Sequence, residues 1–172
     1  MKVSERLQVS ADAFFSSVVT SVLYDIEQAT GEKLTAGDLK EGYTYHKSLQ
    51  AKVGGARKVT TTITAFDAPR LYEASFTSGQ GVNTVRYEIA PVEGENAIDV
   101  SYEEGFTGNK ASTDLNGKLM GSLYSWSAKK RIKKRLHQME TYLQSHPDAG
   151  AAADTAASPE ELTSAQAEES EE

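Results

Sequence analysis

The chain has no cysteine, only four prolines and a single tryptophan among its 172 residues. The absence of cysteine excludes disulfide bonds and thiolate metal sites. No apolar run approaches the roughly 20 residues that a membrane-spanning helix requires. The first ten residues lack the apolar segment of a secretory signal peptide. We therefore expect a cytoplasmic, soluble domain, because 38% hydrophobic residues over this length suffice to bury a core without covalent cross-links.

The C-terminal segment, residues 147–172, contains no Lys, no Arg and no aromatic residue, but eight of the 25 acids. The formal net charge of −7 arises there, because residues 1–146 hold 17 acids against 18 bases. Such a segment has too little apolar surface to offset the entropy of ordering. We predict a folded domain over residues 1–146 and a disordered acidic tail, rich in Ala, Ser and Glu, over residues 147–172.

The N-terminal part predicts a strand followed by a helix. Apolar and polar residues alternate over residues 2–9, which is typical of a half-buried strand. Ser10 can then cap a helix in which apolar residues recur at helical spacing from Phe14 to Ile26, and Gly31 can end it.

Five extended runs follow, separated by short loops rich in Gly, Pro and Asn, and they predict consecutive antiparallel neighbours. The runs are residues 42–53, 57–66, 71–78, 82–92 and 97–106. Their residues alternate between a polar face of Thr, Ser, Glu and Arg and an inner, apolar face. The predicted inner face consists of Tyr43, Tyr45, Leu49, Val59, Ile63, Tyr72, Ala74, Phe76, Val85, Tyr87, Ile89, Ile98, Val100, Tyr102 and Phe106.

The last element, residues 114–145, reads as one long helix whose apolar stripe changes phase. The first stripe is Leu115, Leu119, Leu123 and Trp126, and the second is Ala128, Ile132, Leu136, Met139 and Leu143. At about 100° per residue the two stripes lie roughly 90–130° apart. Either the helix bends or breaks near residues 125–127, or it covers an unusually wide surface. In both cases Leu136 and Met139 are expected in the core.

This order of elements resembles the START-like, helix-grip (SRPBCC) superfamily, which includes the birch-pollen-allergen-like proteins. The stretches Ser21–Gly31 and Lys129–Leu136 resemble an uncharacterised bacterial domain-of-unknown-function family within that superfamily. The resemblance covers residues 1–145. It implies an α+β fold in which a curved antiparallel sheet of about six strands grips the C-terminal helix around an apolar cavity. It carries over no catalytic residues, because the superfamily has no shared catalytic motif.

The candidate ligand-binding residues are those that the strand pattern directs toward this cavity. Any single inward tyrosine is better explained as core, but four together favour a polar-lined pocket. Inward Lys, Asn and Glu are costly unless they are paired or hydrated, and positions at strand ends explain them equally well. With three apolar residues of the helix, the predicted set is Tyr45, Lys47, Tyr72, Asn83, Tyr87, Tyr102, Glu104, Leu119, Leu123 and Trp126.

Other features predict no cofactor, metal site or catalytic residue. Six bases fall within Lys129–Arg135, which suits an anionic partner but is better explained as a solvated helix face. The domain lacks the interleaved aromatic residues of a nucleic-acid platform, so no nucleic-acid partner is expected. His46, His137 and His146 are too scattered for a metal site.

The sequence therefore favours binding of a small, mainly apolar or lipid-like ligand without catalysis. One alternative is a cyclase, dehydratase or hydrolase in the same cavity, with Glu104 and a tyrosine as its acid-base pair. Another is an interaction module that uses the basic helix.

Overall fold

The computed structural model describes residues 1–51, 55–108 and 117–146, with side chains described except at 49–51, 55–57 and 117–126. The elements follow the predicted order. They are β1 (Lys2–Leu7), α1 (Ala11–Thr30), the short 3-10 helix η1 (Ala36–Asp38), β2 (Thr44–Ala51), β3 (Gly55–Asp67), β4 (Leu71–Ser78), β5 (Gly81–Pro91), β6 (Ile98–Gly108) and α2 (Gly117–Ser145). The predicted tail lies outside the described residues. Within them, no helix is both long and apolar enough to cross a membrane.

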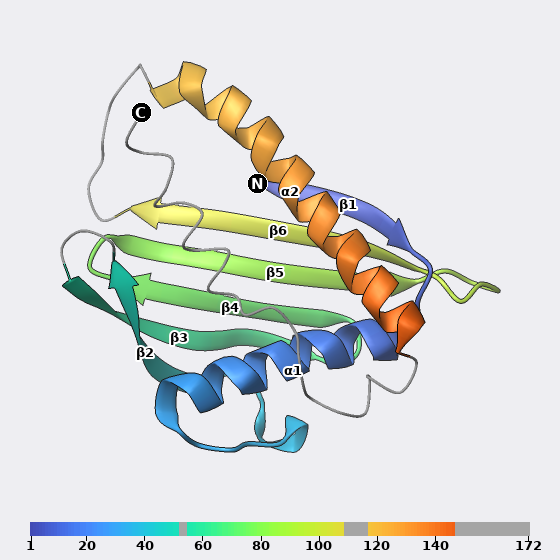
Figure 1. Ribbon diagram of the computed structural model, residues 1–172, viewed down its shortest axis with the longest axis horizontal. Coiled ribbons are helices and arrows are strands. Elements are labelled where there is room, and N and C mark those ends of the chain that lie inside the picture. The colour runs from blue at the N-terminus through green and yellow to red at the C-terminus, as the bar shows by residue number, and fades with distance from the viewer. Residues whose placement is uncertain (52–54, 109–116, 147–172) are drawn as a thin grey trace.

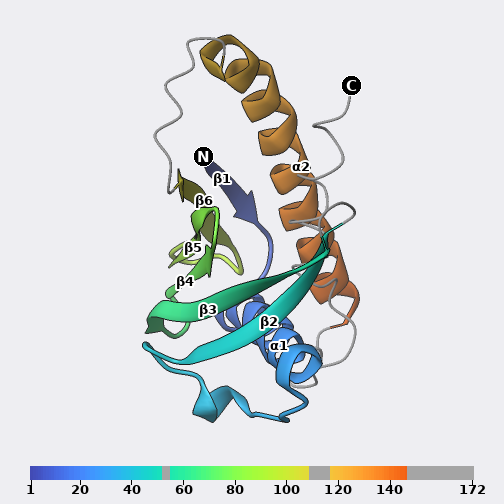
Figure 2. The ribbon, with the colours of Figure 1, turned by 90° about the vertical axis from the view of Figure 1, so that its left-hand side faces the viewer.

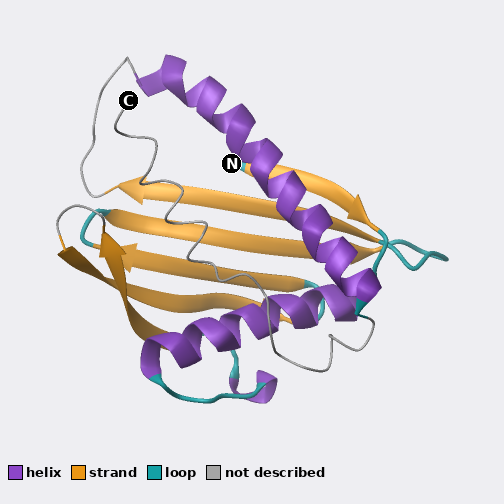
Figure 3. Ribbon diagram, viewed as in Figure 1, coloured by secondary structure: helices purple, strands orange, loops and turns teal. Residues whose placement is uncertain are grey.

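The six strands form one antiparallel sheet in the order β1-β6-β5-β4-β3-β2. The N-terminal strand thus pairs with the last strand, and the meander β2 to β6 fills the rest of the sheet (Figures 1 and 3). Both helices lie on the same side of the sheet (Figure 2). The opposite face is polar, as predicted. Arg86, for example, binds Glu73 and Glu88 there at 2.7 Å each.

Local signals in the sequence determine where α1 begins and ends. The Ser10 hydroxyl accepts a hydrogen bond from the Ala13 N–H at 3.2 Å. Gly31 adopts φ 77°, a left-handed conformation that costs glycine little, and its N–H binds the Glu27 carbonyl at 2.8 Å. The apolar stripe between these caps, including Phe14 and Ile26, is buried against the sheet.

The core lies where α1 and the C-terminal half of α2 meet β1 and the adjoining end of the sheet. Leu136 is only 2% exposed, and Met139 packs against the core as a partly buried residue. Both core predictions are therefore confirmed. The helix is continuous from Gly117 to Ser145, so of the alternatives left open by the phase change a break near residues 125–127 is excluded. Of the first stripe, Leu115 lies outside the described residues.

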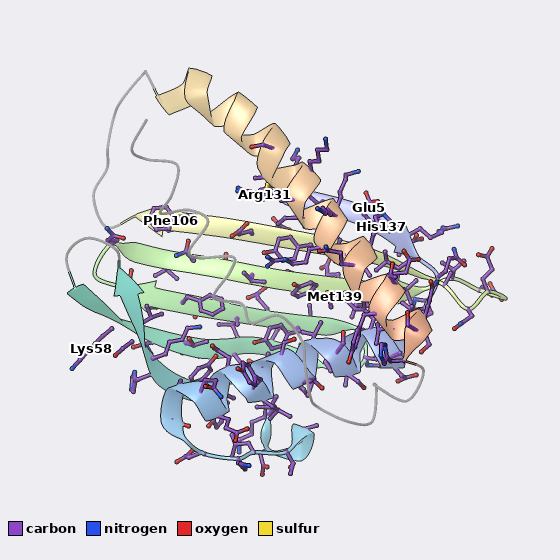
Figure 4. All side chains as sticks on the ribbon, viewed as in Figure 1. Glu5, Lys58, Phe106, Arg131, His137 and Met139 are labelled. Atoms are coloured by element: carbon purple, nitrogen blue, oxygen red, sulfur yellow. The ribbon has the colours of Figure 1, made fainter. Side chains whose placement is uncertain are left out.

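Three carboxylate contacts clasp α2 to β1. His137 Nε2 lies 3.0 Å from Glu5 Oε2, and its Nδ1 lies 2.8 Å from Glu140 Oε2. Lys133 Nζ binds the other Glu5 oxygen at 2.6 Å, and Glu140 accepts a hydrogen bond from the Gln8 N–H. Figure 4 shows Glu5 and His137 together on the side of α2 that lies over β1. The contacts of Glu5 with Lys133 and His137 and of Glu140 with Gln8 join residues 128 to 132 positions apart and fix the C-terminal half of the helix, whereas the His137–Glu140 contact lies within α2.

The clasp predicts a pH-dependent contribution to stability. Hydrogen bonds to Glu140 and Glu5 raise the pKa of His137. The charged imidazole therefore contributes its full stabilisation at pH values below about 6.5, the pKa of histidine in the unfolded chain. This contribution is lost as the pH rises through the raised pKa of the folded state. The hydrogen bond from Lys133 lowers the pKa of Glu5, which stays ionised down to pH values below its usual range. His137→Gln should therefore lower the thermal midpoint more at pH 5.5 than at pH 9.

His146→Gln is the matched control, because among the described residues His146 stacks on Tyr142 at 4.5 Å and bonds the Tyr142 carbonyl, both within the neighbouring turn of α2. Its effect on the midpoint should be small at both pH values. Equal losses at pH 5.5 and pH 9 in the His137 variant would contradict an ionic role for the clasp.

Candidate functional site

The register of the sheet places the predicted inner tyrosines side by side. Tyr72, Tyr87 and Tyr102 are direct neighbours across β4, β5 and β6. The rings of Tyr87 and Tyr102 meet edge to face with centroids 5.0 Å apart, and Phe14 of α1 lies 6.2 Å from Tyr87. This aromatic row crosses the inner face at the level where Phe14 of α1 packs on the sheet.

Two further inner rows lie beyond the tyrosines, toward the C-terminal end of β6. The first consists of Ile63, Ala74, Val85 and Glu104 across β3 to β6, and the second of Tyr45, Thr61, Phe76, Asn83 and Phe106 across β2 to β6. Asn83 and Glu104 thus lie on the inner face within strands, as the alternation predicts. The structure brings these polar residues and the tyrosine row onto one surface.

Burial decreases toward the outer ends of β4, β5 and β6, whereas Tyr45, Thr61 and Ile63 of the same rows, on β2 and β3, stay buried. Tyr72 and Tyr102 are buried, Phe76 and Val85 are half-buried, and Phe106 is 62% exposed. Placing Phe106 in the core was wrong, although its predicted face is correct. The buried half of α2 contacts β1 and α1, whereas Phe106 lies at the far end of β6 (Figure 4).

The tyrosine hydroxyls are hydrogen-bond donors near neutral pH. Burial raises the pKa of Tyr87 to about 12 and raises the pKa values of Tyr72 and Tyr102 as well. The Tyr102 hydroxyl is buried and has no hydrogen-bond partner among the described residues. A buried polar atom without a partner is costly, so this hydroxyl marks a position where a polar group would be bound favourably.

Glu104 is the half-buried acid of the inner face. Burial raises its pKa, and the positive charges of the Met1 amine, Arg131 and Arg135 oppose this effect. Chemically, the surface offers phenol donors, one carboxyl group with a raised pKa and an amide beside apolar side chains. It can orient a mainly apolar molecule through a few polar contacts.

Lys47 and Tyr45 belong to a different polar cluster, centred on Asp25 of α1. Lys47 Nζ lies 3.0 Å from each Asp25 carboxylate oxygen, and the Tyr45 hydroxyl donates to Asp25 Oδ2. The Lys47 and Asp25 side chains are only 8% and 6% exposed. Burial, followed by the charge of Asp25, raises the pKa of Tyr45. Lys47 therefore has its counterion within the protein, although its Nζ also lies 5.6 Å from the centre of the Phe76 ring.

Sequence reasoning missed Asp25. Its signal was present, because Asp25 follows Val18 by seven residues and Val22 by three, which places it on the apolar stripe of α1. A carboxylate on a buried stripe requires a buried cation, and Lys47 is the lysine that the strand pattern directed inward.

A separate hollow of about 620 Å³ lies beside this cluster, where α1 approaches β2 and β3. Mostly polar side chains line it, namely those of Asp25, Gln28, Ala29, His46, Lys47, Ser48, Lys58 and Thr60. Lys47 is the predicted site residue that reaches this space. Within the described part of the chain, no three His, Asp or Glu side chains gather as metal ligands.

The remaining predicted site residues belong to α2. The backbone of Leu119, Leu123 and Trp126 lies in that helix, but their side chains are outside the described residues. Their part in a ligand site stays a prediction.

The strand order and the two helices define a helix-grip fold of the birch-pollen-allergen-like type. The chain belongs to the family described as domain of unknown function DUF3284, whose model matches residues 1–125. No curated protein matches the sequence.

Solved structures show the same fold at low sequence identity. The crystal structure of Ara h 8.0201 has a TM-score of 0.54 at 9% identity and covers 84% of this chain and 97% of its own. Norcoclaurine synthase from Thalictrum flavum, in complex with dopamine and hydroxybenzaldehyde, has a TM-score of 0.53 at 9% identity over 85% and 86% of the two chains. A protein of unknown function from Staphylococcus aureus, SA2116, reaches 0.52 at 15% identity over 84% and 96%. These likenesses establish the fold alone.

Proposed function

We propose that the protein binds a small, mainly apolar molecule on the inner face of β4, β5 and β6, the side of the sheet on which both helices lie (Figure 2). The observation that carries this proposal is the incomplete burial of apolar inner residues beyond the tyrosine row. Phe76 and Val85 are half-buried and Phe106 is exposed, on the face that elsewhere forms the core. Proteins of this fold commonly bind hydrophobic ligands, which supports the same location.

The energetics favour such a ligand. Covering apolar surface contributes about 25 cal/mol per Å², so a molecule that covers the Phe106 ring and its half-buried neighbours gains free energy without displacing packed side chains. The neighbouring Tyr87, Asn83 and Glu104 provide the few polar contacts that would fix its orientation.

Phe106→Ala should weaken binding of a neutral apolar probe such as Nile red severalfold, because the ring is proposed to lie against the ligand. It should change the free energy of unfolding by less than about 0.5 kcal/mol, because the ring is mostly exposed. Fluorescence titration measures the first quantity and urea denaturation the second. Trp126, the only tryptophan, offers an independent intrinsic signal for the same titration.

Tyr24→Ala provides the matched control, because Tyr24 is the other large, exposed aromatic residue of the described chain, at 43%, and lies on α1. It should leave Nile red binding unchanged. Equal weakening by both substitutions, or no binding by the unsubstituted protein across a range of neutral apolar compounds, would refute the proposed function.

A further inference from the structure

The basic run of α2 is divided between two sides of the helix. Ala128, Ile132 and Leu136 form the buried stripe, and at about 100° per residue Arg131 and Arg135 flank it on one side. Lys133 flanks it on the other side, where it binds Glu5. Figure 4 shows Arg131 on the side of the helix toward β6, opposite Glu5 and His137.

The charges of the two arginines influence the polar residues of the proposed ligand surface. The positive charges of Arg131 and Arg135 lower the pKa of the Glu104 carboxyl. The charge of Arg135 also lowers the pKa values of the Tyr87 and Tyr102 hydroxyls. Arg131 and Arg135 thus lie close enough to Glu104 for their charges to act on its carboxyl. Burial raises the pKa of that carboxyl, and the charges of the N-terminal amine, Arg131 and Arg135 lower it.

The hydroxyl of Tyr102 gives a second, independent indication of what this place binds. The residue is 1% exposed, and its hydroxyl lacks a hydrogen-bond partner among the described residues. A phenol donor beside guanidinium groups favours an oxygen acceptor that carries negative charge, since charge-assisted hydrogen bonds are roughly twice as strong as neutral ones.

We propose that the ligand is an amphiphile with an anionic head group, held by Arg131, Arg135 and the Tyr102 hydroxyl, while its apolar part lies along Val85, Phe76 and Phe106. This inference rests on the proposed function, because it assigns the chemical class of the same ligand. The apolar surface supplies most of the affinity, and the arginines select the charge of the head group.

Three compounds with one C12 tail test the selection, namely dodecanoate, dodecanol and dodecylamine, each displacing Nile red below its critical micelle concentration. Dodecanoate should bind at least about tenfold more tightly than dodecanol, and dodecylamine more weakly than dodecanol. In the variant Arg131→Gln/Arg135→Gln the preference for dodecanoate should fall below about threefold, while the affinity for dodecanol stays the same. Arg131→Gln alone, at an exposed position, should lose part of the preference and does not depend on the folding of the double variant.

Lys134→Gln removes one charge from an exposed position on the solvent side of the same helix and should keep the full preference. If it lowers the preference as much as Arg131→Gln does, a general surface field explains the selection and the inference is wrong. Equal affinities for all three compounds, or a preference for the amine, would also overturn the inference while leaving the proposed function intact. If the protein binds neither Nile red nor dodecanol, the proposed function itself fails.

Discussion

Asp25→Ala should destabilise the domain by about 3–5 kcal/mol, because it leaves the buried Lys47 ammonium without its counterion. It also removes the acceptor of the Tyr45 hydroxyl, which is buried in the same cluster. Urea denaturation followed by far-UV circular dichroism measures the loss. A cost below about 1 kcal/mol would mean that water solvates Lys47 through the neighbouring hollow.

The double variant Asp25→Leu/Lys47→Met separates charge from packing. Replacing both partners of a buried ion pair by apolar residues of similar size is often neutral or stabilising, so most of the lost stability should return. A double variant as unstable as Asp25→Ala would show that shape, rather than the unpaired charge, determines the cost.

Leu136→Ala should cost about 2–5 kcal/mol through lost burial and the cavity that remains. Leu136 is 2% exposed and packs in the core that joins α2 to β1 and α1. The same denaturation experiment applies, with Lys134→Ala as a control on the exposed side of the helix that should stay within about 0.5 kcal/mol. A near-neutral result at Leu136 would contradict the position of α2 on the sheet.

The elements that the sequence predicted well are those set by neighbours along the chain. Ser10 and Gly31 end α1 through contacts within four residues, and the alternation in the strands assigns each residue to a face. Pairing within the meander β2 to β6 follows from short loops. The pairing of β1 with β6 does not, because it joins residues far apart in the sequence, such as Lys2 and Glu103.

The features that the sequence did not predict depend on contacts between distant residues. Asp25 meets Lys47 across 22 residues, and Glu5 meets His137 across 132, so neither partner indicates the other locally. Phe106 shows the same limit. Its face follows from alternation, but its exposure depends on where α2 crosses the sheet.

The change of phase between the two apolar stripes of α2 is real, but it does not break the helix, which was one of the alternatives considered. A helix can carry two apolar stripes of different phase and remain continuous, and the backbone of α2 is continuous from Gly117 to Ser145. Its C-terminal half is anchored by Leu136 and by the clasp at His137.

The central claim, that a ligand lies on the inner face of the sheet, is tested most directly by methyl NMR of two valines on β5. Val85 belongs to the inner row with Ala74 and Glu104, whereas Val82 has the opposite parity three residues earlier. Titration with dodecanol should shift the Val85 methyl signals progressively and leave those of Val82 nearly unchanged. Shifts confined to Val82, or saturable binding of dodecanol without any change at Val85, would contradict the claim.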